Sequence, residues 1–147
     1  MKSETSAKFT LWVNRIIALI VFVLCFAMYD LLVWYRGIRE MPWQICAVIL
    51  AAFYVCVPAV LYGLWCIEKL LRNILKEDVF IQSNVRYIRR IRWCCAGVSV
   101  LCIPAACVYQ PLIFMVVIMG FLAMVVSVVK NVMAAAVEMR EENDLTV

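Results

Sequence analysis

The sequence contains few side chains that could do chemistry inside an apolar segment, and Asp30 is the clearest of them. An acid within a membrane span usually marks a proton or cation pathway. The alternative is that its carboxylate reaches the outer interface of the membrane or meets Arg36 or Arg39. We favour this alternative because no second buried charge completes a relay. Asp30 is therefore kept as an intramembrane acid with no transported ion assigned.

The cysteines form a second group of candidate reactive side chains, and all eight lie within or at the edge of apolar segments. The sequence has no histidine, and the adjacent pair Cys94 and Cys95 lacks the two-residue spacer of a zinc or redox motif. We interpret the cysteines as small buried hydrophobic residues, with palmitoylation of Cys66, Cys94 or Cys95 as the alternative. The sequence predicts no metal site, no cofactor and no catalytic residue, and an enzyme is the least favoured class.

The composition places the chain in a membrane, since 67% of its residues are hydrophobic and 16% charged. Soluble domains are about 45–50% apolar and about 25% charged. Four apolar blocks fill the 147 residues and leave no room for a separate soluble domain. We predict an all-α, integral membrane four-helix bundle that forms one domain over residues 1–147. The predicted spans are approximately 11–35, 43–67, 93–109 and 111–129. Residues 1–10 are polar and are expected to be frayed.

The positions of tryptophan, lysine and arginine predict how the spans are oriented. Tryptophan collects at membrane interfaces, and the five tryptophans fall at predicted span ends: Trp12, Trp65 and Trp93 on one side, Trp34 and Trp43 on the other. Twelve of the 14 Lys and Arg lie on the first side, and only Arg36 and Arg39 lie on the second. The positive-inside rule then predicts that both termini, the connector 68–92 and the tail 130–147 are cytoplasmic.

Seven of the basic residues lie in the connector, so its local structure matters most. Span 2 is predicted to continue as a helix to Leu75 and to break between Lys76 and Phe80. Ser83 is predicted to cap the next helix, which runs into span 3. Together with the tail, these segments predict cytoplasmic helical extensions of spans 2, 3 and 4.

Four arginines on the predicted second connector helix form the candidate binding surface: Arg86, Arg89, Arg90 and Arg92. They cover an arc of roughly 160° on a helical wheel, opposite Tyr87, Ile88 and Ile91. One interpretation is an anchor on the anionic headgroups of membrane lipids at the inner face. The other is a docking surface for an acidic partner. Direct nucleic-acid binding is not expected, because the basic residues flank apolar segments and are typical of topology determinants.

The tail is predicted to be a helical extension with four acidic residues: Glu138, Glu141, Glu142 and Asp144. A helix C-terminus prefers cations, so this arrangement favours a partner with positive charge. We hypothesise a clamp between the tail and the basic connector, which binding could open. The alternative is a solvated acidic tail.

The stretch NILKEDVFIQSNVRYIRRIRW and the terminal EENDLTV resemble a family of small four-span bacterial membrane proteins catalogued as a domain of unknown function. Such proteins are often encoded beside a Cro/CI-type helix-turn-helix regulator. The resemblance therefore implies a multi-pass protein of the bacterial plasma membrane with a cytoplasmic helix-turn-helix partner. It implies no activity.

The sequence favours a non-enzymatic regulatory or adaptor protein that presents a charged cytoplasmic surface to such a regulator. One alternative is a self-immunity protein against a membrane-active peptide. Another is a homo-oligomer that transports ions or small solutes through a pore around Asp30, Ser99 or Ser127.

Overall fold

The computed structural model describes the backbone of residues 2–76 and 79–145 and the side chains of residues 6–76, 79–143 and 145. The described chain forms four α-helices: α1 (Lys2–Arg39), α2 (Trp43–Leu75), α3 (Gln82–Val108) and α4 (Leu112–Leu145). At 1.5 Å per residue they extend about 40 to 57 Å, compared with a hydrocarbon core of about 30 Å. Each helix is long and apolar enough to cross a membrane. The prediction of an all-α protein with four helices that could cross a membrane is confirmed.

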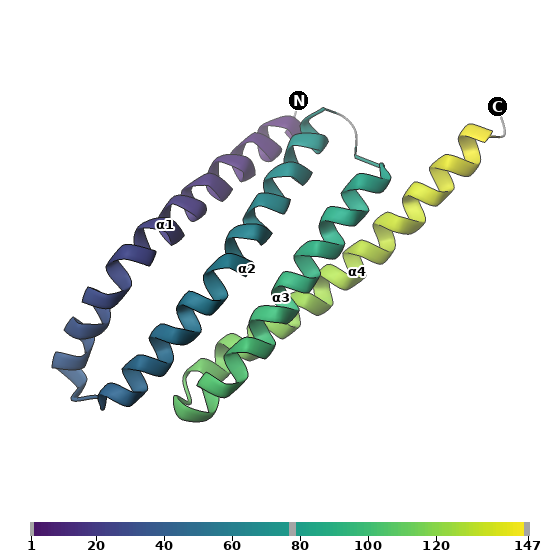
Figure 1. Cartoon of the computed structure of the whole chain (residues 1–147). Coiled ribbons are helices and arrows are strands. Elements are labelled where there is room, and N and C mark those ends of the chain that lie inside the picture. Colours follow the sequence, from purple (N-terminus) through teal and green to yellow (C-terminus); the bar gives the residue numbers. More distant parts are fainter. Residues whose placement is uncertain (1, 77–78, 146–147) are drawn as a thin grey trace.

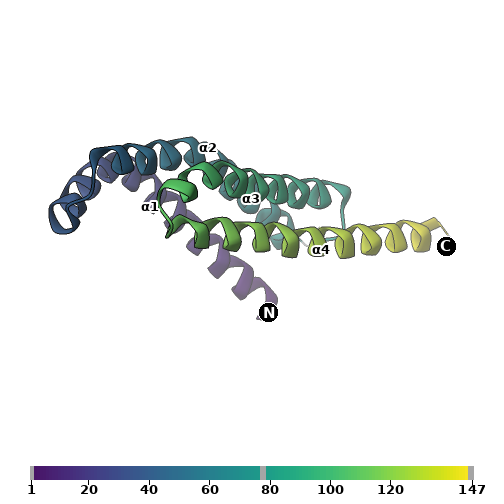
Figure 2. The same ribbon diagram turned by 90° about the horizontal axis from the view of Figure 1, so that it is seen from below.

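The helices run up and down in chain order (Figure 1). Both ends of the described chain and the connector between α2 and α3 lie at one end of the molecule, which we call the connector end. The short loops 40–42 and 109–111 lie at the opposite end, which we call the short-loop end. Helices α3 and α4 run side by side from the short-loop end, as Figure 2 shows.

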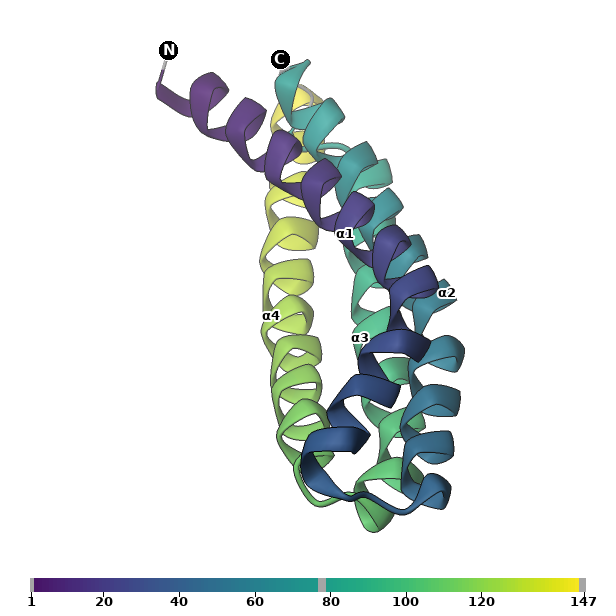
Figure 3. The same cartoon turned by 90° about the vertical axis from the view of Figure 1, so that its left-hand side faces the viewer.

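The predicted four-helix bundle is open rather than closed. Within the described residues, α1 packs on α2, α2 on α3 and α3 on α4, while α1 does not pack against α4. Figures 2 and 3 show the N-terminal part of α1 diverging from α2. Side chains from all four helices line an apolar cavity of about 250 Å³ in the half of the molecule toward the short-loop end. Each helix thus packs on its neighbour in the sequence, as short connections favour, and lipid can cover the remaining apolar surface.

The exterior of the helices is strongly apolar. Phe26 on α1 is 73% exposed and Phe114 on α4 is 69% exposed, and many other large apolar side chains are exposed along the four helices. The buried core is correspondingly small, and part of it is a cluster of Cys56, Val98 and Cys102 between α2 and α3. A surface of this kind would aggregate in water but is what a lipid bilayer solvates.

The observed helix ends agree with the predicted ones in two places and differ from them in two. The extension of α2 to Leu75 and the helical tail on α4 are confirmed. Residues 2–10, expected to be frayed, form the start of α1, which begins at Lys2, and Thr10 donates a hydrogen bond to the carbonyl of Ser6 within it. Met1 lies outside the described residues. The cap of α3 is Ile81, which has extended backbone and no side-chain cap, so the assignment of Ser83 was wrong.

Candidate functional site

The last turns of α2 and the first turns of α3 form a basic hairpin, residues 65–76 and 79–93, at the connector end. Asn84 lies inside it with a fully buried side chain (0% exposed). The Oδ1 of Asn84 accepts a hydrogen bond from Nδ2 of Asn73 at 2.7 Å, and its Nδ2 donates to the carbonyl of Val79 at 2.8 Å. Because both ends of the amide are satisfied, this side chain fixes α2, the connector and α3 relative to one another.

The same contacts explain where α3 begins. The backbone N–H of Asn84 donates to the carbonyl of Ile81, which forms the first hydrogen bond at the start of the helix. The side chain of Asn84 simultaneously holds Val79 in the preceding extended segment. Ser83 is therefore the second residue of the helix, where its hydroxyl cannot serve as the cap.

The structure divides the four predicted arginines into two sets. Arg86, Arg89 and Arg90 have exposed side chains, while Val85 and Ile88 on the same turns are buried, so this part of the wheel is as expected. Arg92 is only half exposed. It donates a hydrogen bond from Nη1 to Oγ of Ser127 on α4 at 3.4 Å, and its guanidinium lies 5.3 Å from the ring centroid of Trp93. Arg92 thus joins α3 to α4 instead of extending the exposed basic surface.

Aromatic rings lie among the cations of the basic hairpin. Tyr62 stacks on Trp65 with centroids 5.9 Å apart, and Trp65 meets the edge of Tyr87 on α3 at 6.4 Å. The Nζ of Lys69 lies 5.7 Å from the centroid of Trp65, and the guanidinium of Arg90 lies 5.9 Å from that of Tyr87. These cation–π interactions place the two cations beside rings of the type found at a membrane interface.

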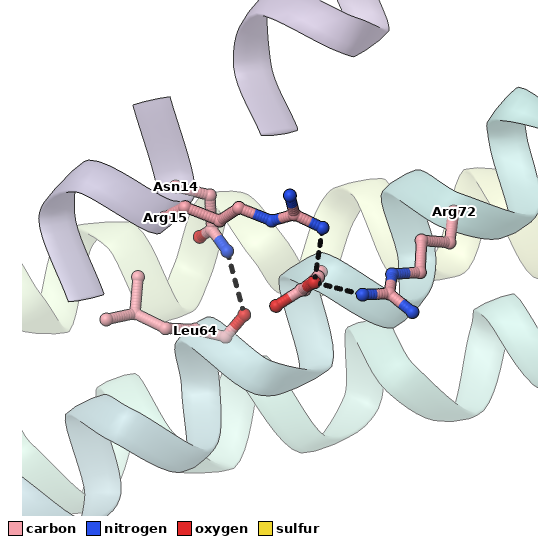
Figure 4. Close-up of polar contacts among 5 residues, drawn as sticks. Asn14, Arg15, Leu64 and Arg72 are labelled. Atoms are coloured by element: carbon pink, nitrogen blue, oxygen red, sulfur yellow. Dashed lines mark hydrogen bonds and ion pairs between the residues drawn. The ribbon is translucent and has the colours of Figure 1, made fainter. Parts of the chain in front are cut away.

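Glu68 connects the basic hairpin to α1. Its Oε1 accepts hydrogen bonds from Arg72 at 2.6 Å and from Arg15 on α1 at 3.3 Å, as Figure 4 shows. One turn away, Nδ2 of the buried Asn14 donates to the carbonyl of Leu64 at 3.1 Å. Arg15 and Asn14 therefore join α1 to α2, while Arg72 pairs with Glu68 within α2.

The acidic residues of the tail lie on the last turns of α4. Glu138, Glu141 and Glu142 have exposed side chains, whereas Val137 beside them is 1% exposed. Glu142 makes an interaction of its own. The side chain of Asp144 lies outside the described residues. No ion pair joins Glu138 or Glu141 to a described side chain, so the clamp between tail and connector stays a prediction.

The candidate pore residues lie apart from one another. Asp30 is exposed on α1, and the guanidinium of Arg36 lies 5.6 Å from the centroid of Trp43. Ser99 donates a hydrogen bond to the carbonyl of Val116 at 2.9 Å, and Ser127 accepts one from Arg92. Both serines are thus used in packing α3 on α4 within one copy of the chain.

The cysteines are all free thiols, and Cys46, Cys56, Cys66 and Cys102 are buried. The Sγ atoms of Cys56 and Cys102 lie 3.7 Å apart between α2 and α3. No group of three or more His, Cys, Asp and Glu side chains among the described residues could hold a metal ion. The packing of these four cysteines agrees with their interpretation as small hydrophobic residues.

Sequence reasoning missed the polar residues that hold the helices together. Asn14 and Asn84 are both buried, at 6% and 0% exposure, and Glu68 lies between two arginines. An asparagine within an otherwise apolar or amphipathic helix was the available signal, because an amide placed there needs a partner. Its partners could not be read from the sequence, since the bond from Asn14 joins residues 50 positions apart.

A comparison with known protein families gives a match. A family model described as "Protein of unknown function (DUF2975)" matches residues 11–147. No curated protein and no solved structure matches the chain.

Proposed function

The chain belongs to the family of proteins of unknown function described as DUF2975, and from this premise we propose that it is a non-enzymatic adaptor of the bacterial plasma membrane. In this proposal it presents a charged cytoplasmic surface to a partner such as a helix-turn-helix regulator. The family supplies no activity, so support for the proposal comes from the charged surface itself.

The distribution of positive charge supports a cytoplasmic connector end. Twelve of the 14 Lys and Arg belong to the segments at this end, and Arg36 and Arg39 belong to the other. The connector, α1 and α4 begin or end there together, so a single orientation satisfies all of them (Figure 1). By the positive-inside rule both termini and the basic hairpin then lie in the cytoplasm.

The observation that carries the proposal is that Arg86, Arg89 and Arg90 are exposed on a rigid support. The buried Asn84 fixes the start of α3, and Arg15, Arg72 and Arg92 are used in internal contacts. A partner that binds a prepared surface loses less conformational freedom than one that must order it. The three exposed guanidinium groups can pair with carboxylates of an acidic partner surface.

The apolar cavity favours a second candidate function. Its 250 Å³ are lined by side chains from all four helices, including Met28, Phe53 and Met119. A self-immunity protein against a membrane-active peptide needs an apolar surface of this kind inside the bilayer. Under that function, substitutions in the cavity should reduce protection against the peptide more than substitutions of the arginines do.

Affinity co-purification of the full chain from its own host tests the adaptor proposal. We expect a small DNA-binding protein to co-purify with the native chain. Replacing Arg86, Arg89 and Arg90 by glutamine should lower its recovery more than about tenfold, because three charge contacts are removed together. Glutamine is preferred to glutamate so that membrane orientation is preserved.

The matched control replaces three other cations of the same end by glutamine: Lys8, Lys130 and Arg140. This control removes equal charge outside the basic hairpin and should retain the partner. Equal loss in both variants, or recovery of no partner with the native chain, would contradict the proposal. Truncation from Glu138 onward then shows whether the acidic tail contributes to recruitment.

A further inference from the structure

A groove runs between α2 and α3 on the outer surface of the molecule and ends at the basic hairpin. It has a volume of about 350 Å³ and is lined by Ala59, Tyr62, Arg90, Trp93, Cys94 and Gly97. Ala59 and Gly97 lie toward the middle of their helices, and Arg90 lies toward the connector end. The groove thus extends about 10 Å along α3 from small apolar residues to a cation.

The floor of the groove is open because of Gly97. A Cβ atom built at this glycine meets no heavy atom within 4 Å. Tyr62 and Trp93 border the groove and are 44% and 65% exposed. No acidic side chain among the described residues lines it. The groove therefore combines an apolar channel, two aromatic borders and one positive end.

We propose that this groove binds a membrane phospholipid with an anionic headgroup. The acyl chain lies over Ala59 and Gly97, and the phosphate pairs with Arg90. Tyr62 and Trp93 lie at the level of the glycerol and headgroup, where amphipathic rings are favoured. Lys69 adds a second cation on the same side, since its Nζ lies over Trp65, which stacks on Tyr62.

A lipid fits this groove better than an acidic protein segment does. The apolar part continues from Trp93 toward the middle of α3, which a bilayer surrounds and a cytoplasmic protein cannot reach. Arg86 is exposed one turn beyond the groove and does not line it. Arg90 belongs to both surfaces, so a phosphate bound to it leaves Arg86 and Arg89 for a partner. The lipid site goes beyond the adaptor function and does not depend on it.

Native mass spectrometry tests the proposal. The full chain is mixed with phosphatidylglycerol or phosphatidylcholine of the same acyl chains and released from detergent in the instrument. The native chain should retain phosphatidylglycerol in preference to phosphatidylcholine. Arg90→Gln should lower phosphatidylglycerol retention about fivefold, the ratio expected for one cation at an anionic surface. Retention of phosphatidylcholine should fall less, because the choline cation already offsets the charge of its phosphate. Arg86→Gln is the control and should change neither lipid.

A second variant tests the apolar part of the groove. Gly97→Leu fills the open floor without a backbone clash and should lower retention of both lipids. Gly37→Leu, where a Cβ also meets nothing within 4 Å, is its control. Equal retention in Arg90→Gln and Arg86→Gln, or in Gly97→Leu and Gly37→Leu, would overturn the proposal. A change of oligomeric state in Gly97→Leu with unchanged lipid retention would assign the groove to a second copy and would overturn it as well.

Discussion

An Asn84→Leu variant is expected to lose the fixed geometry of the basic hairpin. The replacement is similar in size but removes the bonds to Asn73 and to the carbonyl of Val79. Loss of partners for buried polar groups costs about 2 kcal/mol, which raises the population of the open hairpin about 30-fold. The rate of limited trypsin cleavage after Lys76 should rise by a similar factor, because cleavage follows the population of the open form.

The control for this prediction is Asn131→Leu, which makes the same change at an exposed position on α4. A surface substitution of this kind should change stability by less than about 0.5 kcal/mol. If both variants are cleaved at the native rate, Asn84 does not hold the connector, and the rigid support for the exposed arginines is absent.

The packing of α2 on α3 predicts a new disulfide in a Gly63→Cys variant. A Cβ built at Gly63 lies 3.7 Å from Cβ of Cys94, close to the separation of about 3.8 Å found in disulfides. Mild oxidation should therefore join α2 to α3 almost completely. With a specific protease site inserted in the connector, the two halves should stay together on a non-reducing gel after cleavage and separate on reduction.

Two further variants make this cross-linking result specific. Cys56→Ala in the background removes the native thiol that lies 3.7 Å from the thiol of Cys102. Gly97→Cys serves as the matched control, because a Cβ built there meets no heavy atom within 4 Å. Efficient cross-linking of Gly97→Cys, or none of Gly63→Cys, would show that α2 and α3 pack in another register.

The four helices and most of their ends could be predicted because hydropathy and charge act locally along the chain. The continuation of α2 to Leu75 followed from its charged amphipathic sequence, and the break after it came from the connector residues. The start of α3 could not be predicted in this way. It depends on Asn84, whose side chain binds both the connector and α2.

The arrangement of the helices could not be predicted from composition. Apolar side chains that face lipid and those that face another helix are of the same types, as exposed Phe114 and buried Val98 illustrate. The open packing of α1 is instead defined by single polar contacts, among them the hydroxyl of Tyr54 on the carbonyl of Cys25 at 2.7 Å. Residues this far apart in the sequence carry no local signal for one another.

The candidate surface was predicted in part. The helical wheel correctly separated Arg86, Arg89 and Arg90 from the buried Ile88. It could not show that Arg92 turns to Ser127, because that contact depends on the position of α4. Likewise, the groove beside Arg90 requires both α2 and α3 and has no counterpart in either segment alone.

The proposed function requires a basic hairpin that faces the cytoplasm, and labelling of single introduced cysteines in cells tests this orientation most directly. Gln82→Cys and Gln110→Cys make the same change at exposed positions, one at the start of α3 and the other in the loop before α4. A membrane-impermeant maleimide reacts with thiolates in water, so the native cysteines within the spans set a low background.

We predict that Gln110→Cys is labelled in intact cells and that Gln82→Cys is labelled only after the membrane is permeabilised. The reverse pattern would place Arg86, Arg89 and Arg90 outside the cell, beyond the reach of any cytoplasmic regulator, and would contradict the proposed function.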